Sequence, residues 1–221
     1  MSNINDKLLE KLNLKEYIQA SDRCLSEMQF TEHNLAHLSR VVEMSTLILE
    51  SLNYDEHTIE LAELAGYMHD IGNVINRHNH GHLSAVLVHK ILLEHGYELE
   101  DVLSVMSAVG NHDENTGTPV NEISAALIIA DKSDVRRSRV RKRDINSFDI
   151  HDRVNYSVYS STLSIDTDKS IITLKLVLDT QYSSIVEFFN IFSERMKMCK
   201  EASNYLGLRF KLIINEIELL N

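Results

Sequence analysis

The stretch "DEHTIELAELAGYMHDIG", residues 55–72, is the part of the sequence that decides the fold. Its apolar residues recur at steps of three and four, which is the period of a helix with one buried face. Asp55 suits the N-cap of this helix, and Gly72 suits a position just beyond its end. The sequence therefore predicts a helix that presents His69 and Asp70, neighbours in the chain, at its C-terminal end.

Similar helical patterns run from the start of the chain to about residue 135. One helix is expected over residues 32–52, with Thr31 as its N-cap. Its predicted inward stripe comprises Leu35, Leu38, Val41, Val42 and Ser45. Two more helices are expected over about 82–95 and 100–109, and a strongly apolar one over 120–135. Together these segments predict a helical bundle.

The residue pattern changes after residue 145. Residues 153–166 and 170–179 are rich in β-branched residues and tyrosine, and the "TDK" between them is typical of a hairpin turn. A helix is expected over about 184–206, followed by a final strand over 208–219. The predicted fold class is mainly α, with a helical core over residues 1–140 and a small α+β unit of ββαβ order over 141–221.

Charge and hydropathy exclude some classes of partner. A formal net charge of -11 argues against general affinity for nucleic acid, because most of the surface would repel a phosphate backbone. The apolar stretch "AALIIA" is far shorter than the roughly 20 residues that span a bilayer. We therefore expect a cytoplasmic protein that binds neither nucleic acid nor membrane, with a homo-oligomer left open. Cys24 and Cys199 have no metal or disulfide spacing and are expected to act as small hydrophobic residues.

Histidine and aspartate residues stand at the ends of several predicted helices. Six of the eleven histidines fall between His69 and His95. The candidates are His37 within a helix, His69 and Asp70 at a helix end, His80 and His112 in loops, and Asp131 near the end of the apolar helix. Side chains from several helix ends could converge on one metal site with open coordination positions.

Three of these motifs carry a resemblance. His37 in "AHLSRV", the pair in "MHDIGN" and Asp131 in "ADKSD" resemble the ordered signature of the HD superfamily of metal-dependent phosphohydrolases. The likeness covers roughly residues 30–135, and the whole chain resembles bacterial proteins described as HD-domain phosphohydrolases. It implies an HD-type helical bundle in which His37, His69, Asp70 and Asp131 hold a metal ion.

Members with two metals carry further histidines between the pair and the last aspartate. The segment "NHGHLSA" favours His80 over His78 and His82, and "GNHDENTG" points to His112. The resemblance then implies a second metal held by His80, His112 and a bridging Asp70. Imidazole and carboxylate ligands without sulfur suit Fe or Mn, with Co, Ni and Zn as alternatives, rather than Ca or Mg.

Two features depart from the family pattern. Many members carry a lysine after "HDIG", whereas this chain has Asn73, which removes a cation that could meet a substrate phosphate. The glycine-tyrosine-proline motif of the cyclic-dinucleotide members is also missing, with "GTP" at 117–119 in its approximate place. Turnover of cyclic dinucleotides is therefore not expected.

Several polar residues are candidates for substrate contact or catalysis. Asn73 and His33 are candidate substrate contacts, and His33 is expected to share a helix face with His37, four residues later. Lys132 and Arg136 are expected one helical turn apart, where both could neutralise a phosphate.

Asp113, beside His112, is a candidate general base, so that Asp70, His112 and Asp113 form the predicted catalytic set. The rest of the basic run "RRSRVRKR" at 136–143 is expected at a domain junction, at a subunit contact or on a solvated face.

These features predict a metal-dependent phosphohydrolase that uses metal-activated water on a phosphate ester of a small molecule, for example a nucleotide. Two alternatives stay open. The first is a mixed-valent diiron oxygenase, a chemistry that the resemblance also admits. The second is a ligand-binding regulatory protein with a vestigial metal site. The substrate, the native metal, the number of ions, the oligomeric state and the role of the tail are not predicted.

Overall fold

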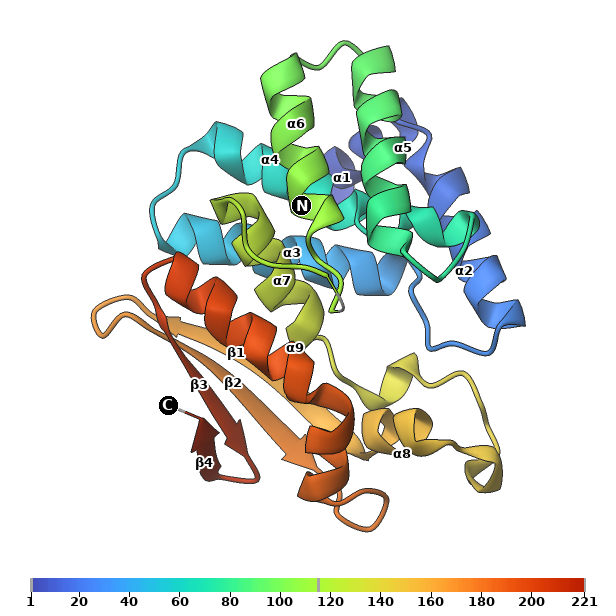
Figure 1. Ribbon diagram of the computed structural model, residues 1–221, viewed down its shortest axis with the longest axis vertical. Helices are drawn as coiled ribbons and strands as arrows, with labels where there is room; N and C mark the ends of the chain where they lie inside the picture. Colours follow the sequence, from blue (N-terminus) through green and yellow to red (C-terminus); the bar gives the residue numbers. More distant parts are fainter. Residues whose placement is uncertain (1, 115, 221) are drawn as a thin grey trace.

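The computed structural model describes residues 2–114 and 116–220 (Figure 1). The helices of the first part are α1 Ser2–Lys11, α2 Leu14–Glu27, α3 Leu35–Ser51, α4 Glu56–Met68, the short 3-10 helix η1 Ile71–Val74, α5 His80–Glu94, α6 Leu99–Gly110 and α7 Glu122–Ser133. They are followed by η2 Arg137–Arg139, η3 Ile145–Ser147, α8 Ile150–Ser157, β1 Val158–Asp166, β2 Ile171–Leu178, α9 Ile185–Tyr205, β3 Arg209–Ile214 and β4 Ile217–Leu220. The fold is mainly α, as predicted.

Helix α7 is the central element of the bundle. It begins at a capping box formed by Asn121 and Ser124, and its residues from Ile123 to Ser133 are all buried. It contacts α3, α4 and α6 on the helical side and α9 on the other. Because neighbours surround this helix, its sequence is apolar all round rather than amphipathic. The apolar helix predicted over 120–135 is confirmed, but it ends at Ser133.

The start of α3 differs from the prediction. Asn34, not Thr31, is the N-cap, because its side-chain oxygen accepts hydrogen bonds from the backbone N–H groups of Ala36 and His37. Leu35 lies in the first turn and is exposed, so it does not belong to the inward stripe, whereas the other four predicted members are buried. His33 therefore precedes the helix, and its predicted helix-face relation to His37 is wrong.

Helix α4 positions the His69-Asp70 pair at its C-terminal end. The Asp55 side chain accepts from the backbone N–H of Thr58, which confirms the predicted cap. The helix ends at Met68, and the chain turns through His69 and Asp70 into η1. Helix α5 then begins at His80, two residues before the predicted start at 82.

Within the described residues, the C-terminal sheet has the strand order β1-β2-β3-β4. Strands β1 and β2 form the predicted antiparallel hairpin, and α9 connects β2 to the parallel strand β3. The predicted final strand over 208–219 is wrong in one respect. The chain turns at Asn215 and Glu216, which both have positive φ, and returns as the antiparallel strand β4. A two-residue turn of this conformation suits the twist of a hairpin.

The strand predicted from residue 153 is also too long. Residues 150–157 form α8, which starts at a capping box between Asp149 and Asp152. The β-propensity of Val154 and Tyr156 favours a strand, but the N-terminal cap and the packing of α8 against α9 stabilise a helix.

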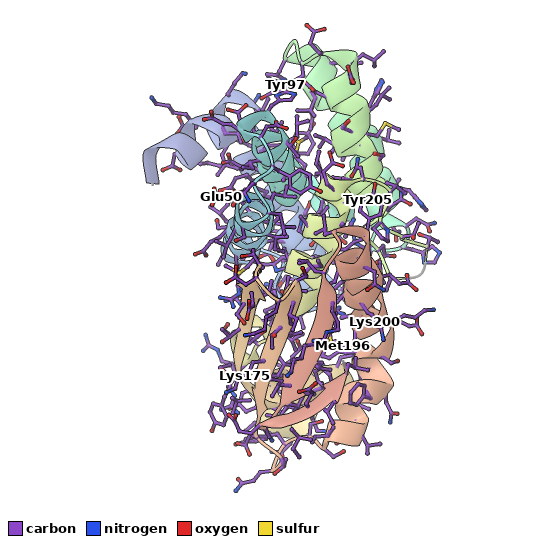
Figure 2. All side chains as sticks on the ribbon, turned by 90° about the vertical axis from the view of Figure 1, so that its left-hand side faces the viewer. Glu50, Tyr97, Lys175, Met196, Lys200 and Tyr205 are labelled. Atoms are coloured by element: carbon purple, nitrogen blue, oxygen red, sulfur yellow. The ribbon has the colours of Figure 1, made fainter. Side chains whose placement is uncertain are left out.

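Helix α9 covers one face of the sheet (Figures 1 and 2). Met196 on α9 is buried against the sheet, whereas Lys200 is exposed and points away from it (Figure 2). One continuous cluster of buried hydrophobic side chains includes residues of both the bundle and the sheet. In the part of the chain that the structure describes, no helix is long and apolar enough to cross a membrane.

Candidate metal centre

Six side chains from five segments meet between the helices. They are His37 from the first turn of α3, His69 and Asp70 after α4, His80 from the start of α5, His112 after α6 and Asp131 from the last turn of α7. None of the six is more than 8% exposed. The structure thus brings together all six residues that the sequence and the resemblance single out as metal ligands.

The four histidines are held by hydrogen bonds on the side away from the cluster. Their Nδ1 partners are the carbonyl oxygens of Gly66 for His69 (2.9 Å), Arg77 for His80 (3.2 Å) and Val109 for His112 (2.6 Å), and the Asp134 carboxylate for His37 (2.7 Å). Because a carbonyl oxygen only accepts, Nδ1 of the three rings that face one must carry the proton. Each of those rings directs Nε2 into the cluster, where it can bind a metal once the ring is neutral.

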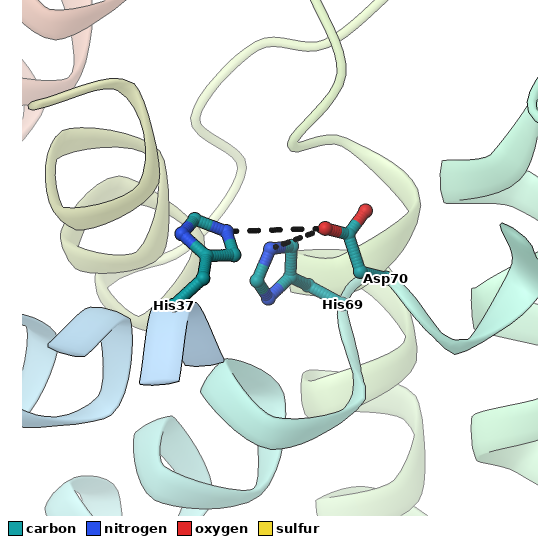
Figure 3. A group of neighbouring side chains, drawn as sticks. All are labelled: His37, His69 and Asp70. Carbon is teal, nitrogen blue, oxygen red and sulfur yellow. Dashed lines mark ion pairs between the residues drawn. The ribbon is translucent and has the colours of Figure 1, made fainter. Parts of the chain in front are cut away.

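Asp70 stands between two groups of histidines. Its Oδ2 lies 3.3 Å from Nε2 of His69 and 3.9 Å from Nε2 of His37 (Figure 3). Its Oδ1 lies 3.3 Å from Nε2 of His80. Asp131 adds an oxygen to the first group, 3.4 Å from Nε2 of His37. One carboxylate therefore presents a separate oxygen to each side, as a bridging ligand must.

The second group shows most directly that a cation fits. Nε2 of His80 lies 3.2 Å from Nε2 of His112, and both rings donate from Nδ1 to carbonyl groups. Burial lowers the pKa of His112 to about 3, which disfavours a proton shared between the two nitrogens. Two lone pairs that face each other at this distance repel unless a positive ion lies between them.

The first group shows the same need for an ion. Within the described residues, Nε2 of His37 and Nε2 of His69 are buried and have no hydrogen-bond partner. Sets of donor atoms close enough to share one ion are His37 with His69 and Asp70, His69 with His112 and Asp131, and Asp70 with His80 and His112. Since buried polar atoms are normally paired, these residues fit divalent metal binding.

The carboxylates are in the charged form that ligates a metal. Burial raises the pKa of Asp70, but His69 and His33 outweigh this effect, so that its pKa lies well below its usual range. Burial likewise raises the pKa of Asp131, and the ammonium group of Lys132 outweighs it. Both groups are therefore ionised at neutral pH and attract a cation.

Asp134 is a site residue that the sequence reasoning missed. It is 1% exposed, and its Oδ2 accepts the Nδ1–H of His37. Arg136 donates to its Oδ1 at 2.6 Å, and Nε of Arg40 forms an ion pair with the same oxygen at 3.1 Å. A buried carboxylate behind a histidine fixes the ring and raises its basicity as a ligand. The only signal was a second aspartate three residues after Asp131, in "DKSD", and spacing alone does not reveal its contact.

Asn73 contacts the pair directly. Its fully buried side chain donates to Oδ1 of Asp70 at 2.9 Å and to the Asp70 carbonyl at 2.8 Å. Its own oxygen accepts from Arg77 at 3.3 Å. Arg77, also missed by the sequence reasoning, therefore places a cation beside the position where the family lysine is absent.

Two other predicted residues border the cluster. His33 is buried, with Nε2 3.9 Å from Oδ2 of Asp70, and its Nδ1 donates to the carbonyl of Thr31. Asp113 has an oxygen 3.9 Å from Nε2 of His80. His78 and His82 are exposed, so the structure places only His80 of these three histidines in the cluster.

Lys132 and Arg136 differ from their predicted arrangement. Lys132 is buried, with Nζ 2.8 Å from Oδ2 of Asp131 and 3.6 Å from Glu114. Arg136 lies beyond the end of α7 in extended conformation and binds both oxygens of Asp134. The predicted spacing of one helical turn is wrong because the helix ends before Arg136. Arg195 of α9 contacts Glu114 at 2.6 Å, so the C-terminal unit reaches the edge of the cluster.

The remaining basic run lies at the junction between the two parts of the chain. Arg137 lies over the rings of Tyr156 and Tyr159. Arg139 donates to the carbonyl of Glu32, and Arg141 donates to the carbonyl of Phe30. These contacts support the junction interpretation rather than a solvated face. The domain boundary at 140 stays a prediction.

Comparison with known proteins identifies the family of this chain. A search of curated proteins finds no match. The family model described as HD domain matches residues 34–145, which is just over half of the chain and includes all six residues of the cluster. With its ordered motifs and their convergence in space, the chain belongs to the HD-domain family of the HD superfamily.

Proposed function

We propose that the protein is a metal-dependent phosphohydrolase that acts on a small phosphate ester, for example a nucleotide. HD-domain proteins are in general metal-dependent hydrolases, and the His and Asp groups of this chain fit divalent metals. The observation that carries the proposal is the position of Asp70, whose two oxygens face separate histidine groups. This arrangement suits two ions that share one carboxylate.

In this proposal His37, His69, Asp70 and Asp131 hold the first metal. Asp70, His80 and His112 hold the second. Metal ions bound there would supply Lewis-acid chemistry: they would lower the pKa of water and neutralise phosphoryl oxygens during in-line displacement. Fe or Mn are proposed first, with Co, Ni and Zn as alternatives, because the donors are nitrogen and oxygen.

The protein side chains would position and neutralise the reacting groups. Asp113 borders the second group, and His80 and Lys132 overcome the effect of burial and lower its pKa, so its carboxylate is ionised and able to accept a proton. Lys132 neutralises the outer oxygen of Asp131 and leaves the other oxygen directed at His37. The six side chains of the cluster are buried, which limits the access of bulk water to the reacting groups.

A phosphate-release screen tests the proposal. Purified protein is freed of metal, reloaded with Mn or Fe, and assayed against nucleotides and other phosphoesters. We expect metal-dependent release of phosphate from at least one class, lost in His69→Ala and Asp70→Ala and retained in His151→Ala, which removes an exposed histidine outside the cluster.

Two other outcomes would contradict the proposal. Oxygen consumption on an organic substrate without phosphate release would favour the diiron oxygenase. Thermal stabilisation by a nucleotide without any turnover would favour a regulatory protein.

A further inference from the structure

Arg77 lies beside the cluster on the side of its second group. It precedes α5, and one guanidinium nitrogen is 3.8 Å from Oδ1 of Asp70, the oxygen that faces His80. The same nitrogen donates a hydrogen bond of 3.3 Å to the side-chain oxygen of Asn73. The Arg77 side chain is 26% exposed, so solvent reaches a cation that also borders the buried donors.

Three other cations near the cluster have shorter or more numerous contacts. Lys132 is bound to Asp131, and Arg195 is bound to Glu114. Arg139 is buried and donates to two backbone carbonyl groups. A guanidinium group has five N–H donors, and within the described residues Arg77 uses one of them, in a bond to a neutral amide. Of these four cations, Arg77 has the longest ion pair with a carboxylate, 3.8 Å, so its charge is the least neutralised and the most available to an incoming anion.

The surroundings hold Arg77 in place without neutralising it fully. Its guanidinium carbon lies 5.7 Å from the centre of the Phe30 ring, within the range of a cation–π contact. Its positive charge contributes to the lowered pKa of His33 on one side and of Asp113 on the other. The charge of Arg77 therefore influences titratable groups on both sides of the cluster.

We propose that Arg77 is the substrate-binding residue that receives a phosphoryl oxygen of an ester held at the Asp70, His80 and His112 group. This inference rests on the proposed phosphohydrolase function and adds a residue to it. A planar guanidinium matches phosphate oxygens with two parallel N–H donors, which a lysine cannot reproduce. No proton transfer is assigned to Arg77, because arginine stays charged in proteins.

Phosphate affinity tests the role without relying on turnover. Inorganic phosphate is titrated into Mn-loaded protein by calorimetry for wild type, Arg77→Gln, Arg77→Lys and Arg143→Gln, and metal content is measured for each. Arg143 is exposed and serves as the matched control. We expect Arg77→Gln to weaken phosphate binding about tenfold or more, because a charge-assisted hydrogen bond is lost. The phosphate affinity of Arg77→Lys should lie between those of Arg77→Gln and wild type, and the affinity of Arg143→Gln should equal that of wild type.

The outcomes separate this inference from the function on which it rests. Phosphate binding that is equal in wild type and both Arg77 variants overturns the role of Arg77 and leaves the proposed function standing. Loss of metal from both Arg77→Gln and Arg77→Lys would show that Arg77 positions Asp70 for metal binding, and would also overturn its role in phosphate binding. Absence of phosphate binding in metal-loaded wild type contradicts both the role and the function.

Discussion

Gly72→Ala is expected to separate the two halves of the metal site. A Cβ atom at residue 72 would lie 2.3 Å from the carbonyl oxygen of His80 and 2.4 Å from the backbone nitrogen of Ser84. Both are backbone atoms of α5, so no side chain can rotate away. Ordinary contact begins at 3.4 Å, and the start of α5 must therefore move by about 1 Å relative to η1.

A displacement of this size exceeds what metal coordination tolerates. Ligand distances in metal sites hold to within about 0.2 Å. Whichever segment moves, the distance between Oδ1 of Asp70 and Nε2 of His80, now 3.3 Å, changes, so that the two atoms no longer fit one ion. We expect the second ion to be lost and the first to be retained. Overpacking should also lower the free energy of unfolding of the metal-free protein by about 1–3 kcal/mol.

Metal content by elemental analysis and urea unfolding of metal-free protein measure the two effects. Gly110→Ala is the matched control, because a Cβ there would meet only the Cβ of Ala85 at 3.4 Å. That variant should keep its metal and be neutral or more stable by up to about 1 kcal/mol. Full metal occupancy and wild-type stability in Gly72→Ala would refute the reasoning.

Three further results are expected. Asp134→Asn removes the charged acceptor of the His37 Nδ1–H and should weaken metal affinity about 10–100-fold in a chelator competition; an unchanged affinity would show that Asp134 does not tune the ligand. Burial raises the pKa of Asp134, but His37 and Arg139 lower it below 3.8 overall, so metal-free protein should lose stability as the pH falls below that value. This acid sensitivity should be smaller in Asp134→Asn, and equal pH profiles would contradict it. Arg137→Ala should cost about 1–2 kcal/mol in urea unfolding through lost contacts with Tyr156 and Tyr159, whereas a cost no larger than that of Arg143→Ala would argue against a structural junction.

Much of the bundle follows from patterns that are local in the sequence. The apolar period of residues 56–68 and the cap at Asp55 predict α4, and with it the position of His69 and Asp70. His37 and Asp131 lie on helices whose buried sides also follow from the apolar pattern of the sequence. The order of the motifs was therefore enough to predict the cluster. The role of each residue in metal binding stays a prediction until it is measured.

The rest depends on contacts that a linear pattern does not contain. Asp134 matters because helix α7 ends at Ser133 and lets the next residue turn toward His37. Arg77 matters because η1 and α5 fold back over Asp70. The turn at Asn215 and the helix α8 are set by backbone geometry and capping, which outweigh the β-propensity of the neighbouring residues.

The number of metal ions bound per chain tests the dinuclear site most directly. Metal-free wild-type protein, reloaded with Mn or Fe and freed of excess ion, should hold two ions per chain, and His80→Ala should hold one. His151→Ala should bind as many as wild type. Wild-type protein that binds no ion, or Asp70→Ala that keeps both, would contradict a site bridged by Asp70.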